Sequence, residues 1–322
     1  MSAGPDIIPS LFHERMIQIY GAQQAAEIRE QLFGPPPLSF RVIDASDPES
    51  VHEDCARHGV ELDEVPWTKG AFRVRAGDRI SLQQTDLARR GAVFIQSLSS
   101  MAAVEALEVQ PGLHALDLCA APGGKTAMIA LRQQGRGVLV ANDRSRSRLA
   151  RLRTVLEQHG VSHVELSCNS GESFGGTHAS CFDRVLVDAP CSGEGMFRCD
   201  DAEAWAEWGL GRIRRLAKQQ ERLLIAGLRC LRPGGVLVYS TCTHAPEENE
   251  AVVHRVLSRI DVDVEVESLP GPVPAGHPGL GTWEGVEFDP QVTLSRRLIP
   301  DGWCTGFFLA RFRRRNDSGP NA

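Results

Sequence analysis

Apolar residues follow two spacing patterns along the first hundred residues of the chain. A return every three or four positions, which predicts helices that bury one face, occurs at residues 12–20, 23–32, 48–58 and 82–90. Short apolar runs that are typical of strands occur at residues 40–43 and 72–74. The Gly-Pro-Pro-Pro run at 34–37 ends the second of these helices. We therefore expect a small α/β module over residues 1–100.

From residue 113 onwards, compact apolar runs alternate with longer helical segments. The runs predict strands at residues 113–119, 138–141, 164–168, 182–187 and 236–239. The helical segments are residues 126–133, 145–159, 212–231 and 247–257. Ser145 suits the N-cap of its helix, and Pro233-Gly234-Gly235 is expected to stop the long one. Such alternation predicts a parallel sheet with helices on both faces, followed here by late strands at 262–266 and 303–312.

The length of the chain suits two domains. No apolar stretch among the 322 residues approaches the ~20 residues that a membrane span needs. We expect the module at 1–100, a catalytic domain at 101–315 and a disordered tail at 316–322. The first six residues lack the basic-then-apolar order of a signal peptide, which predicts a cytoplasmic protein.

The cysteines give little support to a disulfide framework or a metal site. There are nine, an odd number, and no C-x-x-C pair occurs among them. Without a secretory signal this pattern argues against disulfides, and it gives no zinc spacing, so no metal is expected. A small buried apolar side chain is the simplest interpretation for six of them, Cys55, Cys119, Cys168, Cys181, Cys230 and Cys304.

Charge matters here through its distribution. The net charge of −6 argues against a nonspecific nucleic-acid binder, which usually has a basic domain. Only three of the 35 basic residues are lysines, however, and the arginines gather at residues 132–153, 212–232 and 311–315. Arginine suits phosphate because its planar guanidinium binds two oxygens at once. Each cluster is therefore either a phosphate contact or an ordinary solvated helix face.

Small or chemically active residues follow several predicted strands, at the edge where a doubly wound sheet binds ligands. One loop reads Asp117-Leu118-Cys119-Ala120-Ala121-Pro122-Gly123-Gly124-Lys125-Thr126 and has neither Walker spacing nor the G-x-G-x-x-G pattern. Asp143 follows Gly124 by 19 residues at the end of the next strand, a spacing at which an acidic residue can bind ribose hydroxyls. The alternative role for Asp143 is that of a helix N-cap partner. A ribose site without a pyrophosphate cradle fits S-adenosylmethionine better than a dinucleotide.

Two cysteines follow neighbouring strands. Cys191 ends the run Asp188-Ala189-Pro190-Cys191, and Cys242 lies in the run Ser240-Thr241-Cys242-Thr243. Strands four and five should be neighbours, so both thiols are expected to face one cavity. Thiols beside a methyl donor suit methylation of cytosine C5, because addition of a thiolate to C6 gives C5 enamine character. Asp188 is placed to stabilise the charge that develops on the ring near N3.

These motifs resemble those of the RNA 5-methylcytosine methyltransferase family, whose members act on rRNA or tRNA. The resemblance covers about residues 94–257 and rests on the segments 116–126, 188–193, 240–243 and 248–250. It implies a class I methyltransferase fold, an α/β Rossmann-like sheet of seven mostly parallel strands whose last hairpin is antiparallel. It also implies S-adenosyl-L-methionine as the cofactor and RNA as the partner, with rRNA preferred over tRNA.

The resemblance assigns a role to each matching residue. Cys242 is the nucleophile, Cys191 assists product release, and Asp188 completes the catalytic set. Cofactor contacts are implied for Cys119, Ala120, Ala121, Pro122, Gly123, Gly124, Lys125, Asp143, Asn169 and Asp188. Asn169 departs from the family, which often has an acidic residue near the adenine at this point.

The same resemblance favours RNA over DNA, because cytosine-C5 DNA enzymes use the Pro-Cys thiol and this chain has both cysteine motifs. The N-terminal module is expected to contact RNA, and the chain is expected to act as a monomer without a membrane. Two alternatives stay open. One is a class I methyltransferase acting on a small molecule, where both thiols would be idle, and the other is a noncatalytic RNA-binding assembly factor.

Overall fold

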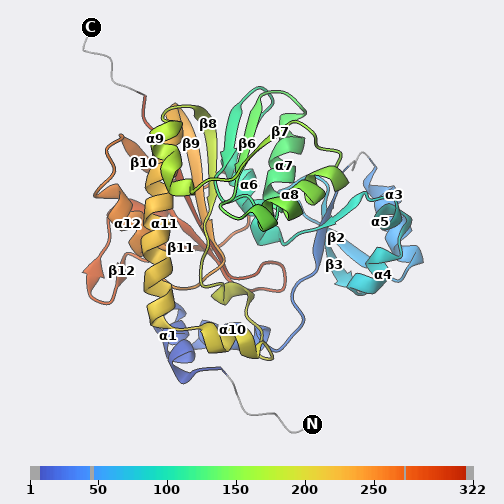
Figure 1. The fold of residues 1–322 in the computed structure, drawn as a ribbon. Coiled ribbons are helices and arrows are strands. Elements are labelled where there is room, and N and C mark those ends of the chain that lie inside the picture. Colours follow the sequence, from blue (N-terminus) through green and yellow to red (C-terminus); the bar gives the residue numbers. More distant parts are fainter. Residues whose placement is uncertain (1–7, 44–46, 272, 317–322) are drawn as a thin grey trace.

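The computed structural model describes residues 8–43, 47–271 and 273–316. It has three parts: a large sheet covered by helices, a smaller sheet beside it, and a group of helices below both (Figure 1). The first six residues, examined above for a leader, lie outside the described residues. The same holds for the predicted disordered tail from residue 317 onwards.

The large sheet has nine strands in the order β11-β14-β15-β9-β8-β5-β6-β7, and β10 also pairs with β15. Their bounds are β5 His114–Asp117, β6 Val138–Asn142, β7 Val164–Ser167, β8 Phe182–Asp188, β9 Leu231–Thr241, β10 Val264–Glu267, β11 His277–Pro278, β14 Arg296–Leu298 and β15 Phe307–Arg314. The five strands from β7 to β9 are parallel, and β15 is antiparallel to β9. The predicted fold class, a mostly parallel sheet closed by an antiparallel pair, is thereby confirmed.

The number of strands differs from the seven that we expected. Beyond β15 the place of a single strand is shared by β10, which pairs with the end of β15, and β14, which pairs with its start. The short β11 then extends the sheet from β14. The long C-terminal segment supplies these additional strands, and their two or three residues leave too short a pattern to be predicted.

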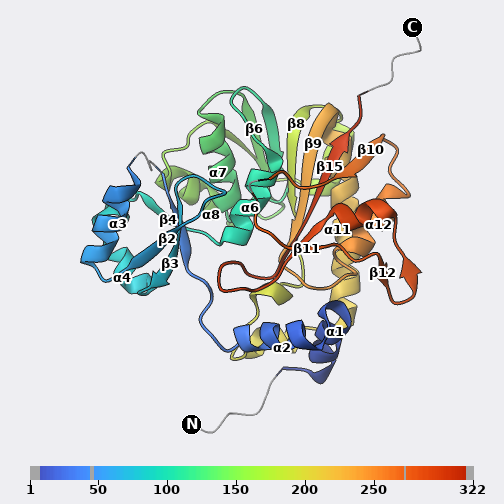
Figure 2. The same ribbon diagram turned by 180° about the vertical axis from the view of Figure 1, so that it is seen from behind.

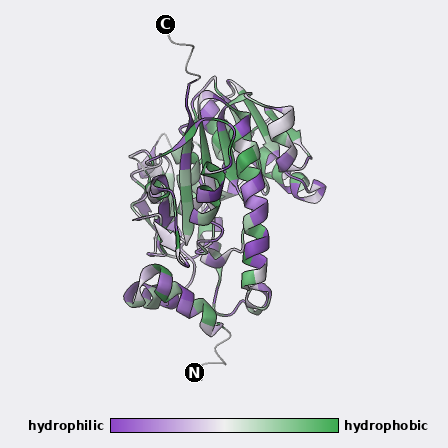
Figure 3. Cartoon of the chain, turned by 90° about the vertical axis from the view of Figure 1, so that its left-hand side faces the viewer, coloured by the Kyte–Doolittle hydropathy of each residue, from purple (hydrophilic) through white to green (hydrophobic). Residues whose placement is uncertain are grey.

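Helices cover both faces of the large sheet (Figures 1 and 2). One face carries α6 Leu98–Leu107, α7 Gly124–Gln133 and α8 Arg146–Gln158, and the other carries α9 Phe174–Thr177, α11 Leu210–Cys230 and α12 Glu250–Leu257. Figure 3 shows apolar residues filling the strands while polar residues face outwards on the helices. This division buries one apolar core on each side of the sheet.

Two details of this domain correct the expectations from the sequence. The helix α6 was missed because eight of its ten residues are buried, so its sequence has no polar face and no helical rhythm. The long helix α11 ends at Cys230, and Pro233, Gly234 and Gly235 lie inside β9 rather than stopping the helix. The predicted boundary near residue 100 falls within α6 and stays a prediction.

The smaller sheet is antiparallel, in the order β2-β3-β1-β4. Its strands are β1 Ser39–Val42, β2 Glu61–Glu64, β3 Ala71–Ala76 and β4 Val93–Ile95, and its helices are α3 Pro48–Arg57, α4 Arg79–Gln83 and α5 Asp86–Arg89. The single helix expected at 82–90 is two short helices, because Thr85 caps the second one by accepting a hydrogen bond from the amide of Ala88.

The first two helices pack far from the sheet that follows them in sequence. Helices α1 Ser10–Tyr20 and α2 Ala22–Gln31 lie beside α10 Ala202–Glu207 (Figure 1). The ring of Phe12 meets the ring of Trp205 edge to face, with centroids 5.0 Å apart. The hairpin of β12 Thr282–Trp283 and β13 Val286–Glu287 and the short helices η1 Gly171–Ser173, η2 Glu194–Met196 and η3 Pro290–Leu294 complete the described elements.

Candidate active site

The four segments predicted from the sequence lie together at the carboxyl ends of β5, β6, β8 and β9. A cavity of about 180 Å³ is lined by the loop after β5, including Cys119 to Lys125, and by Asp188. A second cavity of about 50 Å³ is lined by Asp143 and by residues 170–172. The two cavities meet at Cys119, which lines both.

The loop after β5 approaches its neighbours closely because its residues are small. Gly123 has a φ of +116°, a conformation that side chains other than glycine rarely adopt, and it caps the start of α7. At Gly124 a Cβ atom would stand 3.1 Å from the ring of Phe94 in the smaller sheet. The loop is therefore shaped to leave the cavity open between the two sheets.

Asp117 supplies a buried, incompletely satisfied carboxyl at the wall of this cavity. Its Oδ2 accepts a hydrogen bond of 2.7 Å from the hydroxyl of Thr126, whereas its Oδ1 is buried and has no partner among the residues that the structure describes. Burial raises the pKa of Asp117 to about 7. An orphaned carboxyl oxygen of this kind suits a ligand with an amino group, which would supply the missing donor.

Asp143 is seen in the helix-capping role that the sequence left open, while its contact with a ribose stays a prediction. Its Oδ1 accepts a hydrogen bond of 2.9 Å from the amide of Ser145, which is the N-cap of α8 as predicted. Its Oδ2 lies 3.1 Å from a guanidinium nitrogen of Arg148. Since Asp143 also lines the smaller cavity, its carboxylate is oriented towards a ligand by the start of the helix.

Asn169 is a predicted cofactor contact whose side chain lies outside the lining of the smaller cavity. Its side-chain amide donates to the hydroxyl of Ser167 at 2.8 Å, and it does not line the smaller cavity, whereas the three residues after it do. Its backbone is fixed by Asn142, whose side chain bonds both the amide and the carbonyl of Asn169. A role of Asn169 near an adenine stays a prediction.

Lys125 and Asp188 form an ion pair at the floor of the larger cavity. Their Nζ and Oδ2 atoms are 2.7 Å apart, and the hydroxyl of Ser240 donates to the other oxygen of Asp188, also at 2.7 Å. Burial alone would lower the pKa of Lys125, but the neighbouring Asp188 raises it overall. The lysine therefore stays charged and holds the carboxylate in a fixed orientation.

The two thiols meet as the strand order predicts. The Sγ atoms of Cys191 and Cys242 are 3.3 Å apart, and the amide of Cys242 lies 3.3 Å from the sulfur of Cys191. The hydrogen bond with Cys242, followed by burial, raises the pKa of Cys191 well above its ordinary value. Cys191 therefore keeps its proton at neutral pH.

Two consecutive residues, Glu248 and Asn249, hold the cysteine loops in place. The carboxylate of Glu248 accepts from the amide of Ser192 at 3.0 Å and from the side chain of Gln220 at 2.7 Å. Burial raises the pKa of Glu248 to about 7. The side chain of Asn249 accepts from the hydroxyl of Thr241 and donates to the carbonyl of Thr243, so it closes the loop around Cys242.

The two loops also bond to each other directly. The hydroxyls of Ser192 and Thr243 are 2.7 Å apart, and the amide of Gly195 donates to the carbonyl of Cys242 at 2.9 Å. A Cβ atom at Gly195 would lie 2.1 Å from the carbonyl oxygen of Gly306, so only glycine fits there. The relative position of the two sulfurs is therefore fixed by several bonds.

Beneath the Cys242 loop lies a buried polar cluster that reaches into α1. The side chains of Arg297 and Glu250 form an ion pair and are 2% and 0% exposed. Arg297 also donates to the carbonyl of His244 at 2.9 Å and to the hydroxyl of Tyr20 at 3.0 Å. Burial, followed by the charge of Arg297, lowers the pKa of His244 to about 3, so this histidine stays neutral.

Some site residues were missed by the sequence. Phe94, Gln96 and Ser100 line the larger cavity from the segment between the two sheets. The resemblance to the methyltransferase family begins at about residue 94, which was the available signal. Glu248 and Asn249 were noted only as part of a motif, because their partners lie on other elements.

The structure also revises the cysteine and arginine expectations. Cys55, Cys230 and Cys304 are buried as predicted, whereas Cys168 is exposed and Cys119 lines both cavities. In the cluster at 311–315, three arginines lie on β15 and Arg315 follows it, and Arg311, Arg313 and Arg315 are paired with acidic residues. These ion pairs join Arg311 to Glu108 and Glu267, Arg313 to Glu267, and Arg315 to Glu265. That cluster is therefore not a helix face, and its contact with phosphate stays a prediction.

Within the described ranges, no group of three or more histidine, cysteine or acidic side chains lies close enough to hold a metal ion, and the lack of a metal stays a prediction. Over the same ranges, none of the helices combines the length and the apolar character required to cross a bilayer.

Known proteins resemble this chain over most of its length. Residues 104–313 match the family model of the 16S rRNA methyltransferase RsmB/F. The chain is 39% identical to the ribosomal RNA small subunit methyltransferase F of Vibrio parahaemolyticus over 262 residues. This matched region is 80% of this chain and 52% of that protein. It is 36% identical over 256 residues to the tRNA (cytosine(49)-C(5))-methyltransferase of Pyrococcus abyssi, covering 79% of this chain and 80% of that protein.

The fold has a counterpart among solved structures. The crystal structure of a methyltransferase homolog from Pyrococcus horikoshii matches with a TM-score of 0.81 at 33% identity, over 97% of this chain and 100% of that one. The chain spans about half the length of the methyltransferase F relatives that it matches.

Proposed function

Because this chain belongs to the 16S rRNA methyltransferase RsmB/F family, we propose that it transfers a methyl group from S-adenosylmethionine to C5 of cytosine in RNA. The contact of 3.3 Å between the sulfurs of Cys191 and Cys242 is the observation that carries this proposal. Methyl transfer to a small molecule, or to an amino group, gives no use for two thiols at one strand edge. A noncatalytic assembly factor has no need of the bonds that fix both cysteine loops.

The residues around Cys119 fit the parts of S-adenosylmethionine. Asp117, with its orphaned Oδ1, would bind the amino group, and Asp143 would bind the ribose. The loop from Cys119 to Lys125 would lie against the cofactor without obstructing it, since its residues are small. When bound, the cofactor supplies an electrophilic methyl group.

Residues of this chain would act on the cytosine ring in two stages, attack at C6 and release of the methylated product. The sulfur of Cys242 forms a bond to C6, and the ion pair of Lys125 and Asp188 stabilises the charge that develops on the ring. After C5 has gained its methyl group, a solvent water takes the C5 proton, the electrons of that C–H bond restore the C5–C6 double bond, and the C6–S bond breaks with its electron pair returning to the sulfur of Cys242. We assign help with this release to Cys191, which touches the departing sulfur.

We propose two classes of RNA as the substrate of this reaction. The relatives named above act on small-subunit rRNA and on tRNA, and we propose rRNA first and tRNA second for this chain. The N-terminal module with its small antiparallel sheet is the proposed RNA-binding part, because β4 leads directly into the wall of the larger cavity. Action as a monomer in the cytoplasm stays part of the proposal.

Substitution of each thiol tests the mechanism. Cys242→Ala should abolish transfer of tritiated methyl groups to RNA and should leave no covalent protein–RNA species. Cys191→Ala should still permit attack at C6 but stall release, so that an adduct stable on denaturing gels accumulates. The double variant should lose that adduct.

A matched cysteine control is available in Cys181→Ala, at the opposite end of β8, which should behave like the wild type. An adduct that forms in Cys242→Ala and disappears in Cys191→Ala would reverse the two assignments. Unchanged methylation in both variants would exclude covalent catalysis by this pair.

A further inference from the structure

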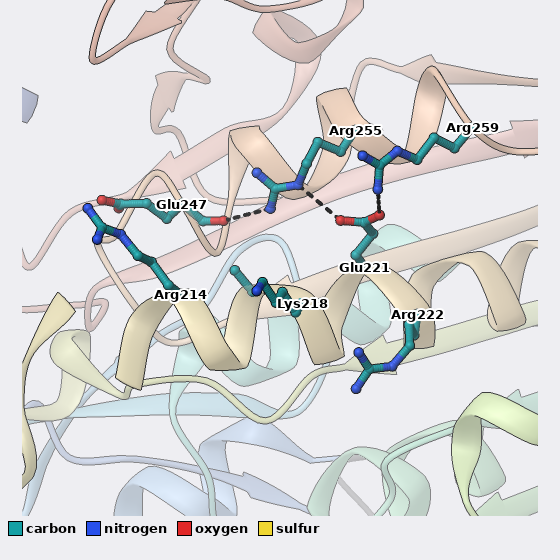
Figure 4. A pocket seen from close by; sticks show the side chains of 8 residues that line it. Arg214, Lys218, Glu221, Arg222, Glu247, Arg255 and Arg259 are labelled. Carbon is teal, nitrogen blue, oxygen red and sulfur yellow. Dashed lines mark hydrogen bonds and ion pairs between the residues drawn. The ribbon is translucent and has the colours of Figure 1, made fainter. Parts of the chain in front are cut away.

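A basic groove lies between α11 and α12, and its lining shares no residue with the two cavities of the candidate active site (Figure 4). The groove has a volume of about 600 Å³. Its charged lining consists of five cations and two carboxylates, namely Arg214, Lys218, Arg222, Arg255, Arg259, Glu221 and Glu247. The groove is therefore locally cationic on a chain whose net charge is −6.

The carboxylates of the groove are already occupied by guanidinium groups. Glu221 accepts a hydrogen bond of 3.0 Å from Arg255 and also pairs with Arg259, as Figure 4 shows. One oxygen of Glu247 is bound at 2.7 Å by Arg15, which lies outside the groove. Glu221 thus holds Arg255 and Arg259 in place and offsets one of their two charges, while Arg15 offsets the charge of Glu247.

Two of the cations have no such partner. Arg214 and Lys218 are exposed and pair with no acidic side chain in the part of the chain that the structure describes. Exposed charges of this kind are available to a ligand at little cost in stability, since they hold no contact within the fold. They are the groups that a partner would meet first.

The spacing of the cations favours an extended anion. Arg214, Lys218 and Arg222 recur every four residues along α11, which separates neighbours by ~6 Å along the axis and the outer two by ~12 Å. Arg255 lies on α12, and Arg259 follows it by four residues, just beyond the end of that helix. Groups spread over this length cannot converge on one phosphate. A small organic ligand is also disfavoured, because Ala217 is the only apolar residue in the lining and such pockets are mostly apolar.

We propose that the groove between α11 and α12 binds the phosphate backbone of RNA outside the target nucleotide, an inference that rests on the proposed function. Four of its five cations are arginines, whose fork binds phosphate through two bonds. The same helix serves the active site on its inner side, where the side chain of Gln220 donates to the carbonyl of Pro190 at 2.8 Å. Arg222 pairs at 3.1 Å with Glu172, which lines the smaller cavity.

The test compares salt dependence of RNA binding in the full chain. The double variant Arg214→Gln/Lys218→Gln should bind a fluorescent single-stranded RNA more weakly than the wild type. The slope of log K against log salt should become shallower by about 1.4, at about 0.7 for each lost phosphate contact. The matched control Arg136→Gln/Arg153→Gln removes two exposed arginines elsewhere and should keep the wild-type slope. At saturating RNA, kcat should be unchanged in both variants while KM for RNA rises only in the groove variant.

Equal slopes in the wild type and the groove variant would overturn the inference. So would binding of poly-L-glutamate that is weakened by the groove substitutions as strongly as RNA binding, because the groove would then suit an acidic protein. Inorganic phosphate should fail to compete with RNA at equal phosphate concentration, and effective competition would contradict an extended site. A wild-type protein that methylates no RNA but keeps the difference in slope would contradict the proposed function and support the groove.

Discussion

The contact between Cys191 and Cys242 shows how much a single pair of side chains depends on its setting. Their sulfurs lie within hydrogen-bonding distance, and the thiol of Cys191 has a pKa well above its ordinary value. The adjacent strand ends were enough to predict that the two thiols lie close together, but neither thiol lines the two cavities of the candidate site. The raised pKa of Cys191 follows from its hydrogen bond with Cys242 and from its burial, both of which depend on three-dimensional contact.

This proximity predicts sensitivity to oxidation at the residue scale. Hydrogen peroxide should join the two thiols, because one S–S bond forms while both protons and two electrons pass to the peroxide, which gives water. We expect methylation to fall, a Cys191–Cys242 peptide to appear in mass spectrometry of unreduced digests, and activity to return with dithiothreitol.

The variant Cys191→Ala cannot form this bond and should give no linked peptide, whereas Cys181→Ala should respond to peroxide as the wild type does. Loss of activity without the linked peptide would assign the damage to another residue.

A second prediction at this scale concerns the ribose contact. Asp143→Ala should weaken binding of S-adenosylmethionine by about 10- to 150-fold, since hydrogen bonds to a charged group contribute ~1.5–3 kcal/mol each. Isothermal titration calorimetry measures the change directly. Unchanged affinity would remove Asp143 from the site.

The neighbouring position Asn169 offers a comparison in the same assay. A similar loss in Asn169→Ala would support its predicted contact with the adenine. If Asn169→Ala binds S-adenosylmethionine with wild-type affinity, Asn169 does not contact the cofactor, and its observed role is the hydrogen bond to Ser167.

At the scale of elements, the loops after β8 and β9 are held by the start of α12. Glu248 binds the first loop and Asn249 the second, so two consecutive residues set the distance between the sulfurs. Both lie 0% exposed, which makes their hydrogen bonds costly to lose.

This arrangement predicts a dependence of stability on pH. The pKa of Glu248 is raised by burial from 4.5 to about 7, so the folded protein binds more protons than the unfolded chain between these values. The free energy of unfolding should therefore fall as pH rises through this window, by up to about 3 kcal/mol. Glu248→Gln keeps an acceptor for the amide of Ser192 and should flatten the profile.

Urea unfolding at about pH 5 and about pH 8 measures the difference. Asp117, whose pKa is also about 7, contributes a fall of the same sign in both proteins. The variant should therefore retain part of the slope, and a profile identical to that of the wild type would contradict the assignment to Glu248.

The sequence predicted the elements that carry their own pattern. The five parallel strands and the loops after them were found because each strand is a short apolar run followed by small or reactive residues. The helix α6 and the strand β2 were not, since the first is apolar on all sides and the second reads Glu-Leu-Asp-Glu. Bonds such as those of Glu248 join residues far apart in the chain and leave no local signal.

At the scale of the whole molecule, the pair of Arg297 and Glu250 links β14, α12 and α1. Arg297→Met should destabilise the fold by about 3–5 kcal/mol in urea unfolding, because it leaves the carboxylate of Glu250 buried without its partner. The double variant Arg297→Met/Glu250→Leu should recover much of this loss.

An exposed ion pair provides the control. Arg315 and Glu265 are 54% and 36% exposed, so Arg315→Met should cost less than about 1 kcal/mol. Equal stability of the wild type and Arg297→Met would mean that the buried pair makes no net contribution.

The contacts of α1 also have a consequence for the time course of synthesis. Arg15 and Tyr20 leave the ribosome early, but their partners Glu247, His244 and Arg297 follow 232, 224 and 277 residues later. At roughly 5–20 residues per second, the apolar side of the first helices waits for roughly 10–50 s before it can be covered. The loop around Cys242 in turn reaches its final support only when Arg297 has been made. A nascent chain is therefore expected to stay inactive towards RNA until Arg297 has been made.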